Sequence, residues 1–124
     1  MSSRATILFA ALALIGLYGP VGADPEREQA LERGNAHYLL FCANCHGVNA
    51  DGRGPLVELL KVVPSDLTTL RQTSQGATVT ERVLSAVDGR HQVAADERKM
   101  PVFSDNLEIR TVIEIADYLD SIQK

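Results

Sequence analysis

The sequence has little of what nucleic-acid-binding, disulfide-stabilised or β-sheet proteins require. Its 12 lysines and arginines are outnumbered by 16 aspartates and glutamates, giving a net charge of -4, whereas phosphate binding needs a basic face. It has only two cysteines, separated by two residues, so a disulfide between them would close a very short loop and stabilise little. No stretch alternates apolar and polar residues as a half-buried strand does. The 124 residues fit one all-α domain.

The first 23 residues have the layout of a secretory signal peptide. A weakly basic start precedes an uncharged apolar run of 11 residues, Ile7 to Leu17, and small residues precede a cleavage site after Ala23. The run is shorter than the ~20 residues that span a bilayer, although an uncleaved anchor stays open because all 19 residues from Ala5 to Ala23 are uncharged. We expect residues 1–23 to be removed and residues 24–124 to form the mature domain, without a stable membrane span. Loss of Arg4 leaves 11 basic and 16 acidic residues, a net charge of -5.

Both cysteines belong to the run Cys42-Ala43-Asn44-Cys45-His46. A zinc site usually needs four ligands, and the chain has no second cysteine pair. A thioredoxin-like redox pair follows a strand in a βαβ unit, whereas this run follows a helical pattern. The C-x-x-C-H spacing is the specific signal for covalent attachment of a c-type haem. The sequence therefore predicts one haem, bound through Cys42 and Cys45 and coordinated by His46.

Helical spacing explains why this motif suits haem. Residues three and four apart share one helix face, so both thiols and the imidazole project the same way. Two thioether bonds then fix the porphyrin edge while His46 reaches the iron. The chain has no tryptophan and only three tyrosines and three phenylalanines, and a buried porphyrin would supply the apolar bulk that its core otherwise has little of.

Apolar periodicity and capping patterns predict the helices. The first runs over residues 24–41 and places Gly34 and Tyr38 on its apolar face. A short helix is expected at 56–63, with a capped turn after Ser65 or Asp66. Thr78 and Glu81 form a capping-box pattern for a helix that Gly89 ends. A second such pattern, Asp105 with Glu108, is expected to open the last helix. Its apolar stripe is Ile109, Val112, Ile113, Ala116 and Leu119, broadened by Ile115, Tyr118 and Ile122. A face this wide predicts packing against two elements at once.

The second axial position of the iron has three candidates, Met100, His37 and His91. Met100 is the only methionine after the leader and stands in a loop before the last helix. A methionine thioether raises the haem potential relative to a second imidazole. Taken alone, a methionine could equally fill a gap in the core. With a haem motif upstream we expect Met100 to bind the iron and both histidines to lie at the surface.

These residues resemble the His/Met monohaem cytochrome c family of the bacterial periplasmic type. The resemblance rests on Gly34-x-x-x-Tyr38-x-x-x-Cys42, the C-x-x-C-H motif, Met100 and Tyr118-Leu119, and it covers nearly all of residues 24–124. It implies a cytochrome c fold, in which the N- and C-terminal helices cross and short helices and loops wrap around one haem. In the family, the glycine makes room for the aromatic residue at that crossing.

The resemblance also implies groups around the haem. Gly54-Pro55 resembles the loop whose proline carbonyl accepts a hydrogen bond from the ligand imidazole, which would fix the ring of His46. Pro64-x-Asp66-Leu67-Thr68 resembles a stretch common in bacterial members. Candidates for the haem propionates are Arg71, Arg90 and Thr68.

The resemblance implies single-electron transfer rather than enzyme catalysis. Asp51, Asp66 and Asp88 are interpreted as loop and cap residues, not as catalytic acids. The partners are a redox donor and acceptor, with a dehydrogenase or oxidase that holds the chain as a stable subunit left open. Arg98-Lys99 could form a basic docking spot or only a solvated loop. If Met100 does not bind, the open iron position could instead accept peroxide or a gas.

Overall fold

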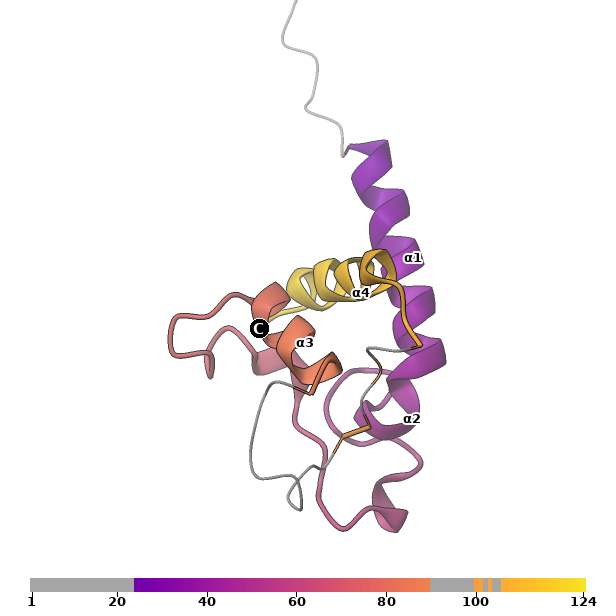
Figure 1. Ribbon diagram of the computed structural model, residues 1–124, viewed down its shortest axis with the longest axis vertical. Helices are drawn as coiled ribbons and strands as arrows, with labels where there is room; N and C mark the ends of the chain where they lie inside the picture. Colours follow the sequence, from indigo (N-terminus) through magenta and orange to yellow (C-terminus); the bar gives the residue numbers. More distant parts are fainter. Residues whose placement is uncertain (1–23, 90–99, 102, 104–105) are drawn as a thin grey trace, which may run out of the picture.

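A computed structural model describes residues 24–89, 100, 101, 103 and 106–124, and this part of the chain is helical without strands. The predicted leader, Arg90, His91, Arg98, Lys99 and Asp105 lie outside the described residues. No helix in the described ranges has the length and hydropathy needed to cross a bilayer. The elements, in chain order, are α1 Pro25–Phe41, α2 Ala43–His46, the 3₁₀ turns η1 Val57–Leu59 and η2 Leu67–Thr69, α3 Val79–Val87, and α4 Ile109–Ser121 (Figure 1).

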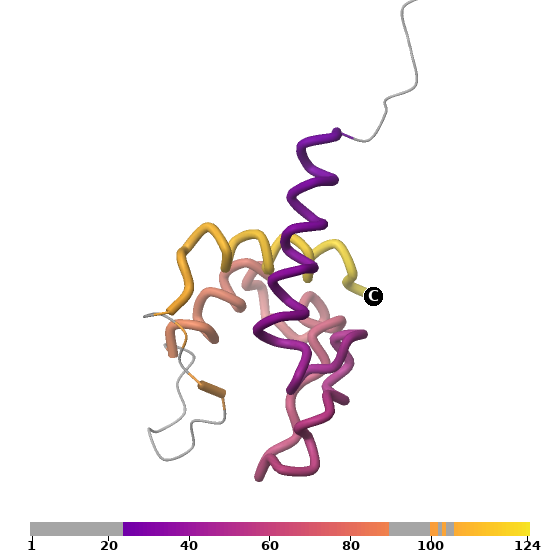
Figure 2. The backbone as a smooth tube through the Cα atoms, turned by 90° about the vertical axis from the view of Figure 1, so that its right-hand side faces the viewer, coloured from indigo at the N-terminus to yellow at the C-terminus, as the bar shows by residue number. Residues whose placement is uncertain are grey.

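The expected crossing of the first and last helices is present. Helix α1 begins at Pro25, with the Asp24 carboxylate accepting a hydrogen bond from the Glu26 amide. It then passes across α4 (Figures 1 and 2). At the crossing a Cβ atom on Gly34 would lie 2.0 Å from the Glu114 carbonyl oxygen and 2.9 Å from Tyr118 Cβ. Only glycine allows this approach, which explains a residue that costs about 1 kcal/mol inside a helix.

The buried face of α4 differs from the predicted stripe. Ile109 is 65% exposed and Ile113 is 40% exposed, so placing these two in the core was wrong. The predicted broadening at Ile115 and the packing against two elements are confirmed, because Ile115 is buried and α4 lies between two helices and turns one side to each. Its buried residues are Val112, Glu114, Ile115, Ala116 and Leu119.

Capping was predicted correctly for α3 but not for α4. The Thr78 and Glu81 side chains and backbones cap α3 reciprocally, and the helix ends two residues before Gly89. Helix α4 begins only after Glu108, which makes no side-chain cap. The amides of Asn106 and Leu107 donate instead to the Phe103 carbonyl, so a separate turn occupies the expected first turn of the helix. The short helix expected at residues 56–63 is limited to the three-residue turn η1.

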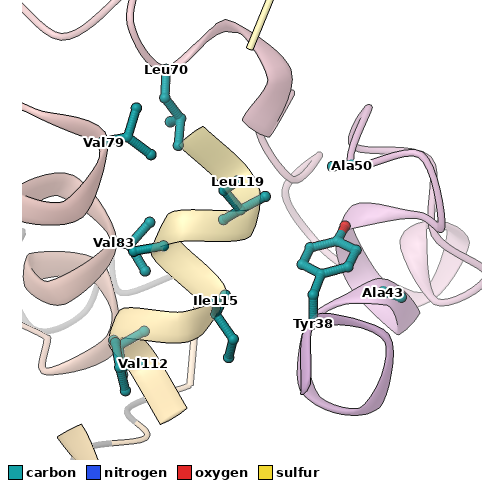
Figure 3. Packing of buried hydrophobic residues seen from close by; sticks show 11 residues of the cluster. Tyr38, Ala43, Ala50, Leu70, Val79, Val83, Val112, Ile115 and Leu119 are labelled. Atoms are coloured by element: carbon teal, nitrogen blue, oxygen red, sulfur yellow. The ribbon is translucent and has the colours of Figure 1, made fainter. Parts of the chain in front are cut away.

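The hydrophobic core joins the three longer helices. Val79 and Val83 of α3 face Val112 and Ile115 of α4, and Tyr38 of α1 lies on the other side of α4 (Figure 3). Tyr38 is fully buried and its ring lies 5.5 Å from that of Tyr118. The C-terminal residues are tied to η2, where the Lys124 amide donates to the Thr68 carbonyl and Gln123 Nε2 donates to the Leu67 carbonyl.

Candidate functional site

The C-x-x-C-H motif forms the turn that follows α1. Cys42 ends α1 and precedes α2, which holds Ala43 to His46. The amides of Cys45 and His46 both donate to the Cys42 carbonyl, at 3.1 and 2.9 Å. The buried Tyr38 hydroxyl donates to the Gly47 carbonyl at 2.5 Å and fixes the end of this turn. The motif therefore has a defined backbone, and both cysteines are free thiols.

The loop after the motif folds back onto it. The Gly54 amide donates to the Cys45 carbonyl and the Leu56 amide to the Asn44 carbonyl. A Cβ atom on Gly54 would lie 2.4 Å from the Asn44 carbonyl oxygen, so a side chain there would push the loop off the motif. This packing positions the segment that continues to Ser65.

The imidazole of His46 is oriented by Ser65. Its Nδ1 lies 3.0 Å from the Ser65 carbonyl oxygen, so the Nδ1–H donates to that carbonyl. In this tautomer Nε2 carries no proton and is free to bind a metal. The expectation that the Pro55 carbonyl plays this role was wrong. The backbone beside Pro55 is bonded to the motif itself, and Pro55 is exposed. The stretch Pro64-x-Asp66, which the sequence singled out, supplies the acceptor instead.

A cavity of about 290 Å³ lies between this motif, α3 and α4. His46 and Met100 both line it, as does Cys42, whereas Cys45 does not. Leu70, Val83, Ile115 and Leu119, which line the cavity, are drawn in Figure 3. The other lining residues are Phe41, Ser65, Leu67, Arg82, Ala86, Val87, Phe103 and Leu107.

His37 lies away from this cavity. Its side chain is 34% exposed, and its Nε2 lies 3.4 Å from Glu114 Oε2 at the crossing of α1 and α4. Glu114 also accepts a hydrogen bond of 2.9 Å from Arg33 Nε and lies 3.5 Å from Arg110 Nε. This cluster was not predicted from the sequence, because a glutamate within an amphipathic helix is usually exposed. Its only sequence signal was the break it makes in the apolar face.

Burial sets the protonation of the cavity residues. Desolvation lowers the pKa of His46, more than the hydrogen bond to Ser65 raises it, and so keeps the ring neutral, as a metal ligand must be. Burial, and then the neighbouring Cys45, raises the pKa of Cys42 to about 11, so its thiol stays protonated at neutral pH.

Two of the three residues suggested for the haem propionates are used elsewhere. Arg71 forms an exposed ion pair with Asp120 at 2.7 Å, and the buried Thr68 donates its hydroxyl to Asp66. Neither lines the cavity, so both suggestions are unsupported, and the third, Arg90, lies outside the described residues. Arg82, Phe103 and Leu107 also line the cavity but were not predicted to do so. No local sequence pattern marks them, because only the tertiary fold brings them together.

The cavity fits the haem that the motif predicts. Its wall is mostly aliphatic and aromatic, as a porphyrin face requires. The donors at the wall are an oriented neutral imidazole and a thioether, the pair that holds the iron in one class of c-type haem site. His46 and Met100 would hold the iron, and Cys42 and Cys45 the porphyrin edge.

Comparison with known proteins agrees with this chemistry. The family model described as cytochrome c matches residues 31–123. No curated protein and no solved structure matched the chain. The matched range contains the motif, the cavity residues, all of α4 and the part of α1 that crosses it.

Proposed function

Because the chain belongs to the cytochrome c family, we propose that it is an exported, periplasmic single-electron carrier whose haem iron is bound by His46 and Met100. The family fixes the coarser part of this function: the chain carries a covalently bound c-type haem, and the domain serves haem-based electron transfer. Such proteins are generally carriers rather than enzymes, and we extend that to this chain.

One observation carries the ligand assignment, namely that His46 and Met100 line the same cavity. The imidazole and the thioether at one apolar cavity would supply the two protein ligands that an electron carrier keeps on its iron in both oxidation states. When bound, the haem supplies a reversible one-electron couple. The chain keeps water from the iron with its apolar wall and holds the imidazole through Ser65, whose carbonyl bond also makes His46 a stronger ligand.

The test is the optical spectrum of the purified ferric protein. We expect the weak charge-transfer band at the red edge that reports a thioether bound to ferric iron. Met100→Leu keeps most of the side-chain volume but removes the sulfur, so the band should disappear and the iron become high-spin. Leu107→Met alters another cavity residue, leaves Met100 in place and should retain the band. A wild-type protein without the band would contradict the Met100 assignment and favour the reading with an open iron position.

One further measurement, the intact mass of the protein purified from its host, tests both the removal of the leader and the number of haems bound. We propose cleavage after Ala23, supported by the apolar run and the small residues before that position. The mass should equal residues 24–124 plus one haem. A mass that includes residues 1–23 would favour the anchor instead.

The proposed partners are a redox donor and acceptor, either of which could be a dehydrogenase or oxidase that keeps the chain as a subunit. Exposed apolar residues in the segment that follows the haem motif support docking on this segment. The segment that bonds to Asn44 through Leu56 continues to Leu59, 79% exposed, and Val63, 73% exposed. Such side chains mark contact surfaces when they gather. Co-purification of a larger redox protein would identify a stable subunit.

A further inference from the structure

The wall of the cavity has one formally charged side chain among the described residues, that of Arg82. It projects from the second turn of α3, where the Arg82 amide donates to the Thr78 carbonyl. The side chain is half-buried. An arginine at an otherwise apolar wall is a natural partner for a negative group in the cavity, because partial burial strengthens the attraction between opposite charges.

Two neighbours hold the Arg82 guanidinium in place. Its Nη1 donates to Thr73 Oγ1 at 2.8 Å and to the Leu70 carbonyl oxygen at 3.3 Å. Thr73 Oγ1 in turn donates to the Thr69 carbonyl at 3.0 Å, which leaves its lone pairs directed to the arginine. Both acceptors are neutral, so they fix the position of the guanidinium without neutralising its charge.

No carboxylate of the described residues forms an ion pair with Arg82, whereas the other arginines close to the packed helices have such partners. Arg33 and Arg110 pair with Glu114, and Arg71 pairs with Asp120. Because Arg82 lines the cavity, a negative group bound there can reach its guanidinium.

We infer that Arg82 binds a propionate carboxylate of the haem. The inference rests on the proposed function, since it places the haem in this cavity. A guanidinium pairs with a carboxylate through parallel N–H donors, and the neutral contacts through Nη1 orient it to do so. Arg82 thereby takes the role first suggested for Arg71 and Thr68, whose polar groups are bonded to Asp120 and Asp66.

The consequence is a shift in the reduction potential. Without the cation, the propionate charge is uncompensated and favours ferric over ferrous iron. In the haem-loaded protein Arg82→Gln should lower the midpoint potential, and at a fixed reference couple the ferrous-to-ferric ratio should fall by about threefold or more. Arg82→Lys keeps the charge and should restore most of the ratio. Arg27→Gln is the control, because it removes the same charge from an exposed position on α1.

The outcomes separate this inference from the proposed function. If wild type shows the thioether band and Arg82→Gln keeps it with a lowered potential, the inference stands. If Arg82→Gln only loses thermal stability while its potential matches that of wild type and Arg27→Gln, Arg82 merely bridges α3 to residues 70–73 and the inference is overturned. Should the glutamine variant not accumulate, a lysine variant with the potential of wild type supports the charge role, and one with a several-fold altered ratio contradicts it. Absence of the band in wild type would instead contradict the proposed function.

Discussion

Helix α4 meets its two helical neighbours in different ways (Figure 3). Against α1 the contact is as close as backbone allows, with Gly34 on the Glu114 carbonyl and the charged groups paired. Against α3 the valines touch, but next to them the same helix lines a cavity of about 290 Å³ through Ile115 and Leu119. The α1 side of α4 is thus closely packed by protein alone, whereas the α3 side leaves the cavity in which we propose that the haem binds.

This difference indicates how the domain divides its tasks. The crossing fixes the end of α1, and through Tyr38 and Gly47 it fixes the turn that carries His46. The side of α4 that lines the cavity contributes apolar walls, and His46 and Met100 place an imidazole and a thioether at the same cavity. Stability of the crossing should therefore depend on packing and charge, and stability of the cavity side on the haem.

The largest expected effect comes from preventing haem attachment with the double variant Cys42→Ser, Cys45→Ser. An empty cavity costs about 24 cal/mol per Å³, so about 290 Å³ amounts to ~7 kcal/mol as an upper bound. That is comparable to the 5–15 kcal/mol that stabilises a typical domain. We expect the haem-free chain to lose its cooperative thermal transition, measured by far-ultraviolet circular dichroism.

The matched control for this double variant is Asn44→Ser, which changes an exposed residue of the same motif and leaves both cysteines in place. It should take up haem and melt as wild type does. A haem-free double variant that still unfolds cooperatively near the wild-type temperature would show that the α3 side is complete without the cofactor.

The next effect in size is that of Gly34→Ala in the haem-loaded protein. Alanine gains about 1 kcal/mol of helix propensity, but its Cβ would lie 2.0 Å from a backbone oxygen of α4. Overpacking of this kind typically lowers the free energy of unfolding by about 1–3 kcal/mol, because the backbone must move. We expect a net loss of about 2 kcal/mol in the free energy of unfolding, measured by denaturant titration. Glu32→Ala, exposed on the same helix, should change little, and a stabilised Gly34→Ala protein would mean that the crossing is looser than described.

The same contrast explains what the sequence could predict. The three longer helices and the capping of α3 follow from local patterns, because periodicity and capping depend on neighbours within a few residues. The crossing at Gly34 was implied by the family resemblance. The acceptor for His46 was assigned to Pro55, ten positions before Ser65, because chain order does not determine which turn of a long loop returns to the imidazole. Arg82 and Glu114 were missed for a related reason. Each is one of several polar residues in an amphipathic helix. Only the packing of α3 and α4 against their neighbours decides which of these polar residues leaves the solvent.

The smallest of these effects concerns the charge at the crossing. The hydrogen bond from Arg33, with further support from Arg110 and His37, lowers the pKa of Glu114 in the folded protein. A lowered folded pKa stabilises the protein above the unfolded value of ~4.3, and this contribution is lost as the pH falls through the folded pKa. Glu114→Gln should therefore cost about 1–2 kcal/mol at neutral pH. The difference from wild type should shrink as the pH falls below the unfolded value and through the lowered folded pKa of Glu114, measured by denaturant titration at each pH.

Asp117→Asn removes one carboxylate from an exposed position three residues along α4, so it controls for the change in net charge. If Glu114→Gln and Asp117→Asn lose equal stability at all pH values, the cluster contributes no more than surface charge does, and the crossing is held by Gly34 and its packing alone. If only Glu114→Gln shows the pH-dependent loss, the paired charges also hold the crossing. The side of α4 that faces α1 is then stabilised by protein groups of two kinds, while the side that faces α3 depends on its cofactor.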